Sequence, residues 1–108
     1  MMSVVERVLS RVDHTPGPFT GTERGDCWIF SGALSHNGYG QIGVGRLGGT
    51  KRAKRRTHRV MYEHEVGPIP VGYQIDHLCR VRACCNPAHL EAVPQAENIR
   101  RQWAATSV

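Results

Sequence analysis

The sequence lacks the long apolar run that would span a membrane, since none of its hydrophobic stretches approaches ~18 residues. It also lacks a recognisable signal peptide, because Glu6 and Arg7 interrupt the amino-terminal stretch MMSVVERVLS. Both absences predict a cytoplasmic protein, in which cysteines are more often metal ligands or reactive thiols than disulfides. With 108 residues and no internal repeat, the chain is expected to form a single domain, residues 1–108, around a modest core.

Acidic residues are missing from one stretch, residues 46–59, which carries seven basic side chains. The rest of the chain has seven basic and nine acidic residues, so the positive net charge of +5 comes from this stretch alone. Concentrated positive charge is typical of phosphate binding and predicts a nucleic-acid partner, whereas a solvated loop is the alternative. Because Gly48 and Gly49 interrupt it, we expect a mobile basic arm over 46–56. The predicted nucleic-acid contacts are Arg46, Lys51, Arg52, Lys54, Arg55, Arg56 and Arg59.

A dinucleotide-binding site is disfavoured by context. Gly38, Gly40 and Gly43 spell G-x-G-x-x-G, but that fingerprint must open a helix inside a strand–helix–strand unit. Here the motif continues into another glycine and the basic run. Glycines in such a strand indicate close backbone approach or a bulge.

Apolar residues near the amino terminus recur at helical spacing and predict a helix within residues 1–14. The stripe packs either on the domain or on a second copy of the chain, so a homodimer is one expectation, with Trp103 as another contact. The stripe consists of Val4, Val5, Val8, Leu9 and Val12.

The remaining pattern predicts short strands and helices, and therefore an α+β fold. Two glycine-rich strands within 27–45 are expected to form an antiparallel sheet. A helix over 57–66 would be capped by Thr57. From 72 to 104 the expected order is strand, loop, strand, helix.

Three of the four cysteines and two of the six histidines lie in the fifteen residues DHLCRVRACCNPAHL. Four residues separate Cys79 from Cys84, and His89 follows five positions later. Sulfur and nitrogen ligands at such spacing suit a structural zinc site, which needs a fourth ligand. Cys85 is adjacent, but sequence neighbours seldom both reach one tetrahedral ion. Cys27 is therefore favoured, with Cys85 as a small buried hydrophobe, and four plain buried thiols as the remaining alternative.

A zinc ion with four protein ligands has no open position and performs no chemistry. Asp76 and His77 would lie free beside it at a strand end. A histidine next to a carboxylate is a candidate general base, although most such histidines are structural.

The stretch DHLCRVRACCNPAHLEAVPQAENIRR resembles the HNH, or ββα-metal, nucleases, and within them the His-Cys box homing endonucleases. The resemblance covers roughly residues 72–102 and extends more loosely back to His58. It implies a small zinc-stabilised ββα-metal finger, here with an amino-terminal sheet and flanking helices. The matching positions are His77, Cys79, Cys84, Asn86, Pro87, His89, Leu90 and Asn98.

The resemblance implies a DNA endonuclease. His77 would be the general base, and Asp76 and Asn98 would hold a catalytic Mg²⁺ or Mn²⁺ ion. His89 would belong to zinc, so a backbone carbonyl is the candidate partner for orienting His77. The structural zinc ligands would be Cys27, Cys79, Cys84 and His89.

The resemblance also implies double-stranded DNA as partner and an origin in a phage or mobile element. A second phosphate contact is expected from Arg46 or Arg59. The alternative function is a non-catalytic, zinc-stabilised DNA-binding module. For the histidines outside the box, packing or a solvated surface is expected: His14, His36, His58 and His64.

Overall fold

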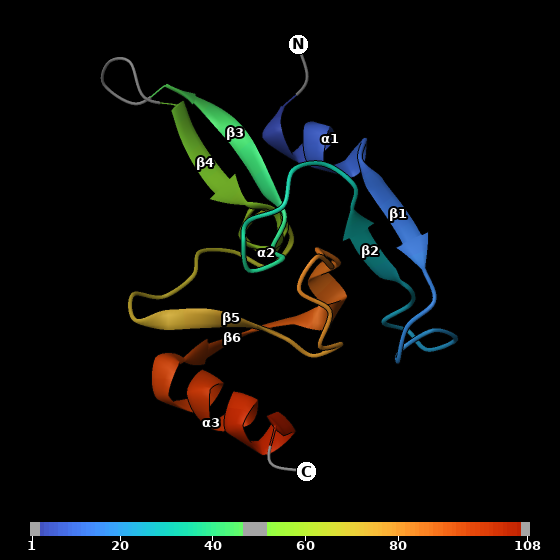
Figure 1. Ribbon diagram of the computed structural model, residues 1–108, viewed down its shortest axis with the longest axis vertical. Helices are drawn as coiled ribbons and strands as arrows, with labels where there is room; N and C mark the ends of the chain where they lie inside the picture. Colours follow the sequence, from blue (N-terminus) through green and yellow to red (C-terminus); the bar gives the residue numbers. More distant parts are fainter. Residues whose placement is uncertain (1–2, 47–51, 107–108) are drawn as a thin grey trace.

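The computed structural model describes residues 3–46 and 52–106, which form three separate antiparallel strand pairs with helices between and around them (Figure 1). The elements in chain order are α1 (Val4–Leu9), β1 (Val12–Thr15), β2 (Cys27–Phe30), β3 (Gln41–Arg46), β4 (Arg52–Arg56), α2 (Thr57–Glu65), β5 (Tyr73–His77), the 3₁₀ turn η1 (Pro87–His89), β6 (Leu90–Pro94) and α3 (Gln95–Thr106). The expected α+β class is confirmed. None of the described helices is long and apolar enough to cross a membrane.

The amino-terminal helix is shorter than the predicted span of residues 1–14. Ser3 and Glu6 form a reciprocal capping box at its start, and Ser10 is its C-cap. The chain then turns into β1, which pairs with β2 and places Val12 opposite Phe30. The helical period of the valines was therefore misleading beyond Leu9, because β-branched Val12 also fits a strand.

The glycine-rich segment forms one strand of a different pair from the one expected. β3 pairs with β4, not with β2, and the ladder has an irregularity between Gly43 and Gly45. The expectation of a mobile arm is thus wrong for residues 52–56, which form a regular strand. Residues 47–51, with Lys51 among them, lie outside the described part of the chain.

The carboxy-terminal third has the expected order of strand, loop, strand and helix. β5 pairs with β6, so that Asp76 lies opposite Glu91 and His77 opposite Leu90. α3 packs against both strands and runs beneath them in Figure 1. The loop from β5 to β6 contains three of the four cysteines, and its Cys84 forms an isolated bridge with Ile29 of β2.

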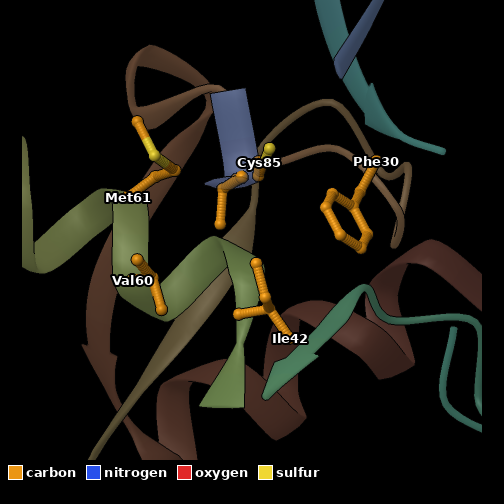
Figure 2. Packing of buried hydrophobic residues seen from close by; sticks show 6 residues of the cluster. Phe30, Ile42, Val60, Met61 and Cys85 are labelled. Carbon is orange, nitrogen blue, oxygen red and sulfur yellow. The ribbon is translucent and has the colours of Figure 1, made fainter. Parts of the chain in front are cut away.

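The main core lies where α1, α2 and β3 meet (Figure 2), and its buried members are Val8, Phe30, Ile42, Val60, Met61 and Cys85. Val4, Val5 and Val12 pack against this cluster. The valines of the apolar stripe therefore face the core of their own chain, whereas Leu9 is 45% exposed, and a homodimer stays a prediction. The side chain of Trp103 lies outside the described residues.

Gly40 lies at the junction between β3 and α2. Its carbonyl accepts a hydrogen bond from the Thr57 backbone at 2.9 Å. A Cβ atom at residue 40 would overlap Thr57 Oγ1 and approach two carbons of Phe30 at 3.0 Å. Thr57 is buried and makes no cap: the N-cap is Arg56, without a side-chain hydrogen bond, which corrects the predicted role of Thr57.

Gly40→Ala is expected to lower the free energy of unfolding by about 1–3 kcal/mol, because the added methyl group overpacks a buried contact. Gly43→Ala is the matched control, since a Cβ there meets no atom within 4 Å. Urea unfolding of both variants measures the difference. Equal stability of the two variants would contradict the packing at Gly40.

Candidate active site and metal centre

Four buried side chains gather at one point between β2, the loop before β6, and η1. They are Cys27, Cys79, Cys84 and His89, and their ligand atoms all lie within 4.8 Å of one another. The Sγ atoms of Cys27 and Cys84 are 3.7 Å and 3.6 Å from His89 Nδ1. Ligands on a tetrahedral zinc with bonds of about 2.0–2.3 Å would be separated by similar distances. The cluster predicted from the sequence could therefore hold zinc.

The other nitrogen of His89 lies close to two backbone carbonyls, Arg24 O at 3.1 Å and Gly25 O at 2.9 Å. A carbonyl only accepts hydrogen bonds, so Nε2 carries the proton and donates. Nδ1 is then left unprotonated and turned toward the thiols. Metal-binding histidines are commonly oriented by such a second hydrogen bond, and this arrangement supports a ligand role for His89.

The three thiols of the cluster differ in the direction in which their pKa values are shifted. A hydrogen bond from Cys84 lowers the pKa of Cys79 to about 5, and the same contact raises the pKa of Cys84. Burial raises the pKa of Cys27. Three thiolates cannot form together in this enclosed space unless a cation compensates them, which is what a divalent metal supplies.

Cys85 lies outside the cluster. It belongs to the main core with Val60 and Met61, and its thiol is 3.5 Å from the Trp28 carbonyl. Burial raises its pKa to about 12. Cys85 therefore occupies the apolar position that the sequence predicted for it, and Cys27 is the cysteine brought to the other three ligands.

A pocket of about 460 Å³ opens beside the cluster, between the β3–β4 side of the molecule and the β5–β6–α3 unit. It brings together Asp76, His77 and Asn98, the residues predicted to perform chemistry. Asp76 is the one acid among its described lining residues, against four arginines. The full lining is Tyr39, Arg56, His58, Arg59, Gln74, Ile75, Asp76, His77, Arg80, Arg82 and Asn98.

His77 is the last residue of β5 and is almost fully buried. Its Nε2 lies 3.1 Å from the Cys84 carbonyl, to which it donates a hydrogen bond. Nδ1 is therefore the nitrogen able to accept a proton. Burial lowers the pKa of His77, which keeps the imidazole neutral near pH 7. A backbone carbonyl thus orients this ring, as the sequence had suggested.

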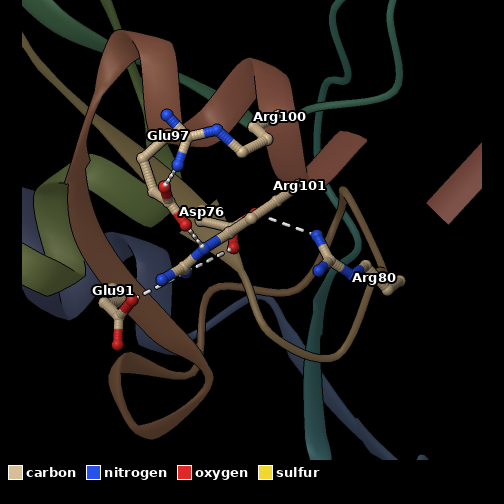
Figure 3. A network of polar contacts seen from close by, with 6 residues as sticks. All are labelled: Asp76, Arg80, Glu91, Glu97, Arg100 and Arg101. Atoms are coloured by element: carbon tan, nitrogen blue, oxygen red, sulfur yellow. Dashed lines mark hydrogen bonds and ion pairs between the residues drawn. The ribbon is translucent and has the colours of Figure 1, made fainter. Parts of the chain in front are cut away.

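Asp76 is buried and is held by two arginines (Figure 3). Arg80 donates to one carboxylate oxygen and Arg101 to the other, each at 3.0 Å. Arg101 also pairs with Glu91 and Glu97, and its pKa is raised by Asp76 and by these two acids. The sequence did not indicate this network, because Arg101 lies 25 residues from Asp76 and meets it only when α3 packs on β5.

A second group in the pocket was not predicted. The rings of Tyr39, His58 and His77 lie 4.7–5.6 Å apart in a triangle. The guanidinium groups of Arg56 and Arg82 lie 4.7 Å and 5.6 Å from the centre of the Tyr39 ring. Tyr39 comes from the loop before β3, so no local motif could have joined it to His77.

Among the predicted phosphate contacts whose side chains the structure describes, Arg56 and Arg59 line the pocket. Lys54 is exposed on β4, while Arg55 is paired with Glu63. The side chains of Arg46 and Arg52 lie outside the described residues.

Residues 55–100 match the family described as HNH endonuclease. This match supports an HNH nuclease as the family that this part of the chain resembles. The matched stretch contains β5, the cysteine loop, β6 and Asn98, together with α2 and its histidines.

Two curated phage proteins are similar to the chain. One is the uncharacterized gene 5.3 protein of Enterobacteria phage T3, 37% identical over 65 residues, which cover 60% of this chain and 64% of that protein. The other is protein 2.8 of Escherichia phage T7, 31% identical over 98 residues, which cover 90% of this chain and 58% of that protein. The chain thus spans less than two thirds of either relative.

A solved structure titled "DNA binding and cleavage by the HNH homing endonuclease I-HmuI" is similar with a TM-score of 0.59 and 21% identity. The match covers 78% of this chain and 46% of that one. At this identity the likeness shows a shared fold, and it extends the comparison beyond residues 55–100.

Cys27→Ser is expected to reduce both the zinc content and the melting temperature, because a structural zinc contributes on the order of 10 kcal/mol of apparent binding energy. Cys85→Ser is the matched control, as it is equally buried but lies outside the cluster. Elemental analysis of purified protein and thermal unfolding provide the two measurements. Zinc loss from Cys85→Ser with none from Cys27→Ser would reverse the assignment of the fourth ligand.

Proposed function

We propose that this chain is a metal-dependent DNA endonuclease that hydrolyses phosphodiester bonds, with His77 as general base and one divalent cation at Asp76 and Asn98. The observation that carries the proposal is the pocket in which these three residues meet several arginines. The match to the HNH endonuclease family is consistent with it. Double-stranded DNA is the proposed substrate.

His77 has the properties that a general base requires. The hydrogen bond to Cys84 fixes its tautomer, so that Nδ1 can take a proton from water. Its lowered pKa keeps Nδ1 unprotonated at neutral pH. The proton of the attacking water would pass to this nitrogen as the water oxygen bonds to phosphorus.

Asp76 and Asn98 fit a hard, oxygen-ligated cation such as Mg²⁺ or Mn²⁺. Both line the pocket, and a carboxylate has about four lone-pair sites, so the two arginine contacts leave acceptor capacity on Asp76. Such a cation would stabilise charge on the phosphoryl oxygens and on the leaving 3′ oxygen. Neither residue is a thiol, so the pocket and the cysteine cluster select different metals.

The arginines of the pocket provide positive charge for the phosphate. Arg59 lies on the first turn of α2, and Arg56 precedes that helix on β4. Lys54, two residues before Arg56, is exposed and continues the positive charge along β4. We propose that the DNA backbone follows this strand into the pocket, with contacts that position it and carry little sequence information.

We further propose that zinc bound by Cys27, Cys79, Cys84 and His89 is structural. All four side chains are buried, and four protein ligands complete a tetrahedron. The alternative function remains a non-catalytic DNA-binding module, and one assay separates the two. Supercoiled plasmid is incubated with the protein and Mg²⁺, Mn²⁺ or EDTA: metal-dependent relaxation supports the nuclease, and DNA binding without cleavage supports the module.

His77→Gln is expected to reduce cleavage by about 10²–10⁴-fold while leaving folding and DNA affinity nearly unchanged. The glutamine amide can keep the hydrogen bond to the Cys84 carbonyl but cannot act as the base. Plasmid nicking, thermal unfolding and DNA binding in EDTA provide the measurements. His64→Gln, at an exposed position of α2, is the control. Full activity of His77→Gln would remove His77 from the chemical step.

Replacing Arg52, Lys54 and Arg56 together with glutamine is expected to weaken DNA binding for all sequences and to flatten its salt dependence. The logarithm of the DNA-binding constant falls linearly with the logarithm of the salt concentration. Each phosphate-binding side chain that is removed makes this negative slope shallower by about 0.9, because fewer counterions are released. Arg24→Gln is the control, since Arg24 lies in the loop between β1 and β2, over Phe19. A salt slope equal to that of the unmodified protein would place β4 off the DNA.

A further inference from the structure

His58 is a second histidine of the pocket, and neither the sequence motif nor the proposed mechanism uses it. It lies in the first turn of α2, its side chain is only 5% exposed, and its ring centre is 4.7 Å from that of His77. It lines the pocket with Asp76 and Asn98. Its burial against Tyr39 and His77 agrees with the prediction that His58 serves packing, but that prediction gives its place in the pocket no role.

The Nδ1 atom of His58 is buried without a hydrogen-bond partner in the described structure. A buried nitrogen without a partner is unfavourable, so an apolar side chain would fill this space better if filling were its only role. A buried nitrogen without a partner is tolerated more readily as a bare acceptor than as an N–H donor. The neutral ring of His58 therefore carries its proton on Nε2 and not on the buried Nδ1.

The surroundings of His58 favour a neutral ring that faces an anion. Burial, together with the nearby His77, Arg56 and Arg59, lowers the pKa of His58 to about 3. A ring with this pKa does not take up a proton near neutral pH, but it offers one N–H donor. The four arginines of the pocket lining attract a phosphate.

Tyr39 restrains this arrangement. Its ring lies 5.4 Å from that of His58 and 5.6 Å from that of His77, and Arg56 stacks on it. A donor held in place before the substrate arrives needs no reorganisation when charge develops on the phosphoryl oxygens.

We infer that His58 is a substrate-contacting catalytic residue, which donates a hydrogen bond from Nε2 to a non-bridging oxygen of the scissile phosphate. The inference rests on the proposed nuclease function and adds a second role to the pocket. His77 accepts a proton from water, whereas His58 stabilises the charge that forms on the phosphate. His58 transfers no proton in this step.

The test compares three substitutions at position 58 in plasmid cleavage with Mg²⁺. His58→Gln places an amide nitrogen near the position of Nε2, His58→Asn places one near Nδ1, and His58→Phe fills the volume without a donor. We expect kcat to fall about 10²–10³-fold in the Phe and Asn variants with little change in KM. The Gln variant should recover at least tenfold. His64→Phe, at an exposed position of the same helix, should cleave as the unmodified protein does.

Thermal unfolding and DNA binding in EDTA accompany the kinetics and identify any variant that has lost its fold. The comparison of Gln with Phe is then made at a temperature where both are folded. If the unmodified protein cleaves and His58→Phe cleaves equally well, or if His58→Gln is no better than His58→Asn, the inference is wrong. If the unmodified protein cleaves no DNA with either metal, the proposed function itself fails.

Discussion

Cys84 joins the two halves of the site, and the arrangement of the pocket depends on it. Its Sγ lies among the zinc-type ligands, 3.6 Å from His89 Nδ1, while its carbonyl accepts the hydrogen bond from His77. Its bridge to Ile29 also connects the cysteine loop to β2, from which Cys27 comes. A displacement of Cys84 in the cysteine cluster would therefore also move the carbonyl that orients the ring of His77. In a domain of this size, a metal cluster can supply rigidity that a small core does not.

The charges of the pocket are organised around one buried acid. Asp76 is held by Arg80 and Arg101, and the latter is itself held by Glu91 and Glu97 (Figure 3). These contacts compensate a carboxylate that would otherwise be costly to bury. The side chain of Arg80 is 49% exposed, whereas that of Arg101 is 29% exposed. The network thus combines a buried, compensated carboxylate with a guanidinium group that stays partly open to the pocket.

Local sequence was informative wherever the elements of the site lie close together in the chain. The strand, loop, strand and helix between residues 72 and 104 form one continuous unit, and it was the resemblance to the HNH nucleases that joined Asn98 to Asp76 and His77. The choice of Cys27 followed from coordination chemistry, because three ligands left one vacancy and Cys85 was too close to Cys84. The structure gathers these residues as expected, while their roles in metal binding and catalysis stay predictions.

Strand pairing and the second part of the pocket were decided only by the tertiary structure. Whether Cys27–Phe30 pairs with residues 12–15 or with 41–46 depends on packing around Phe30 and Ile42, and both choices satisfy the same local pattern. The sequence determined which side chains could bind metal, activate water and attract phosphate. Only the fold brought Tyr39 and His58 beside His77, because contacts between distant segments depend on how the separate strand pairs pack around α2.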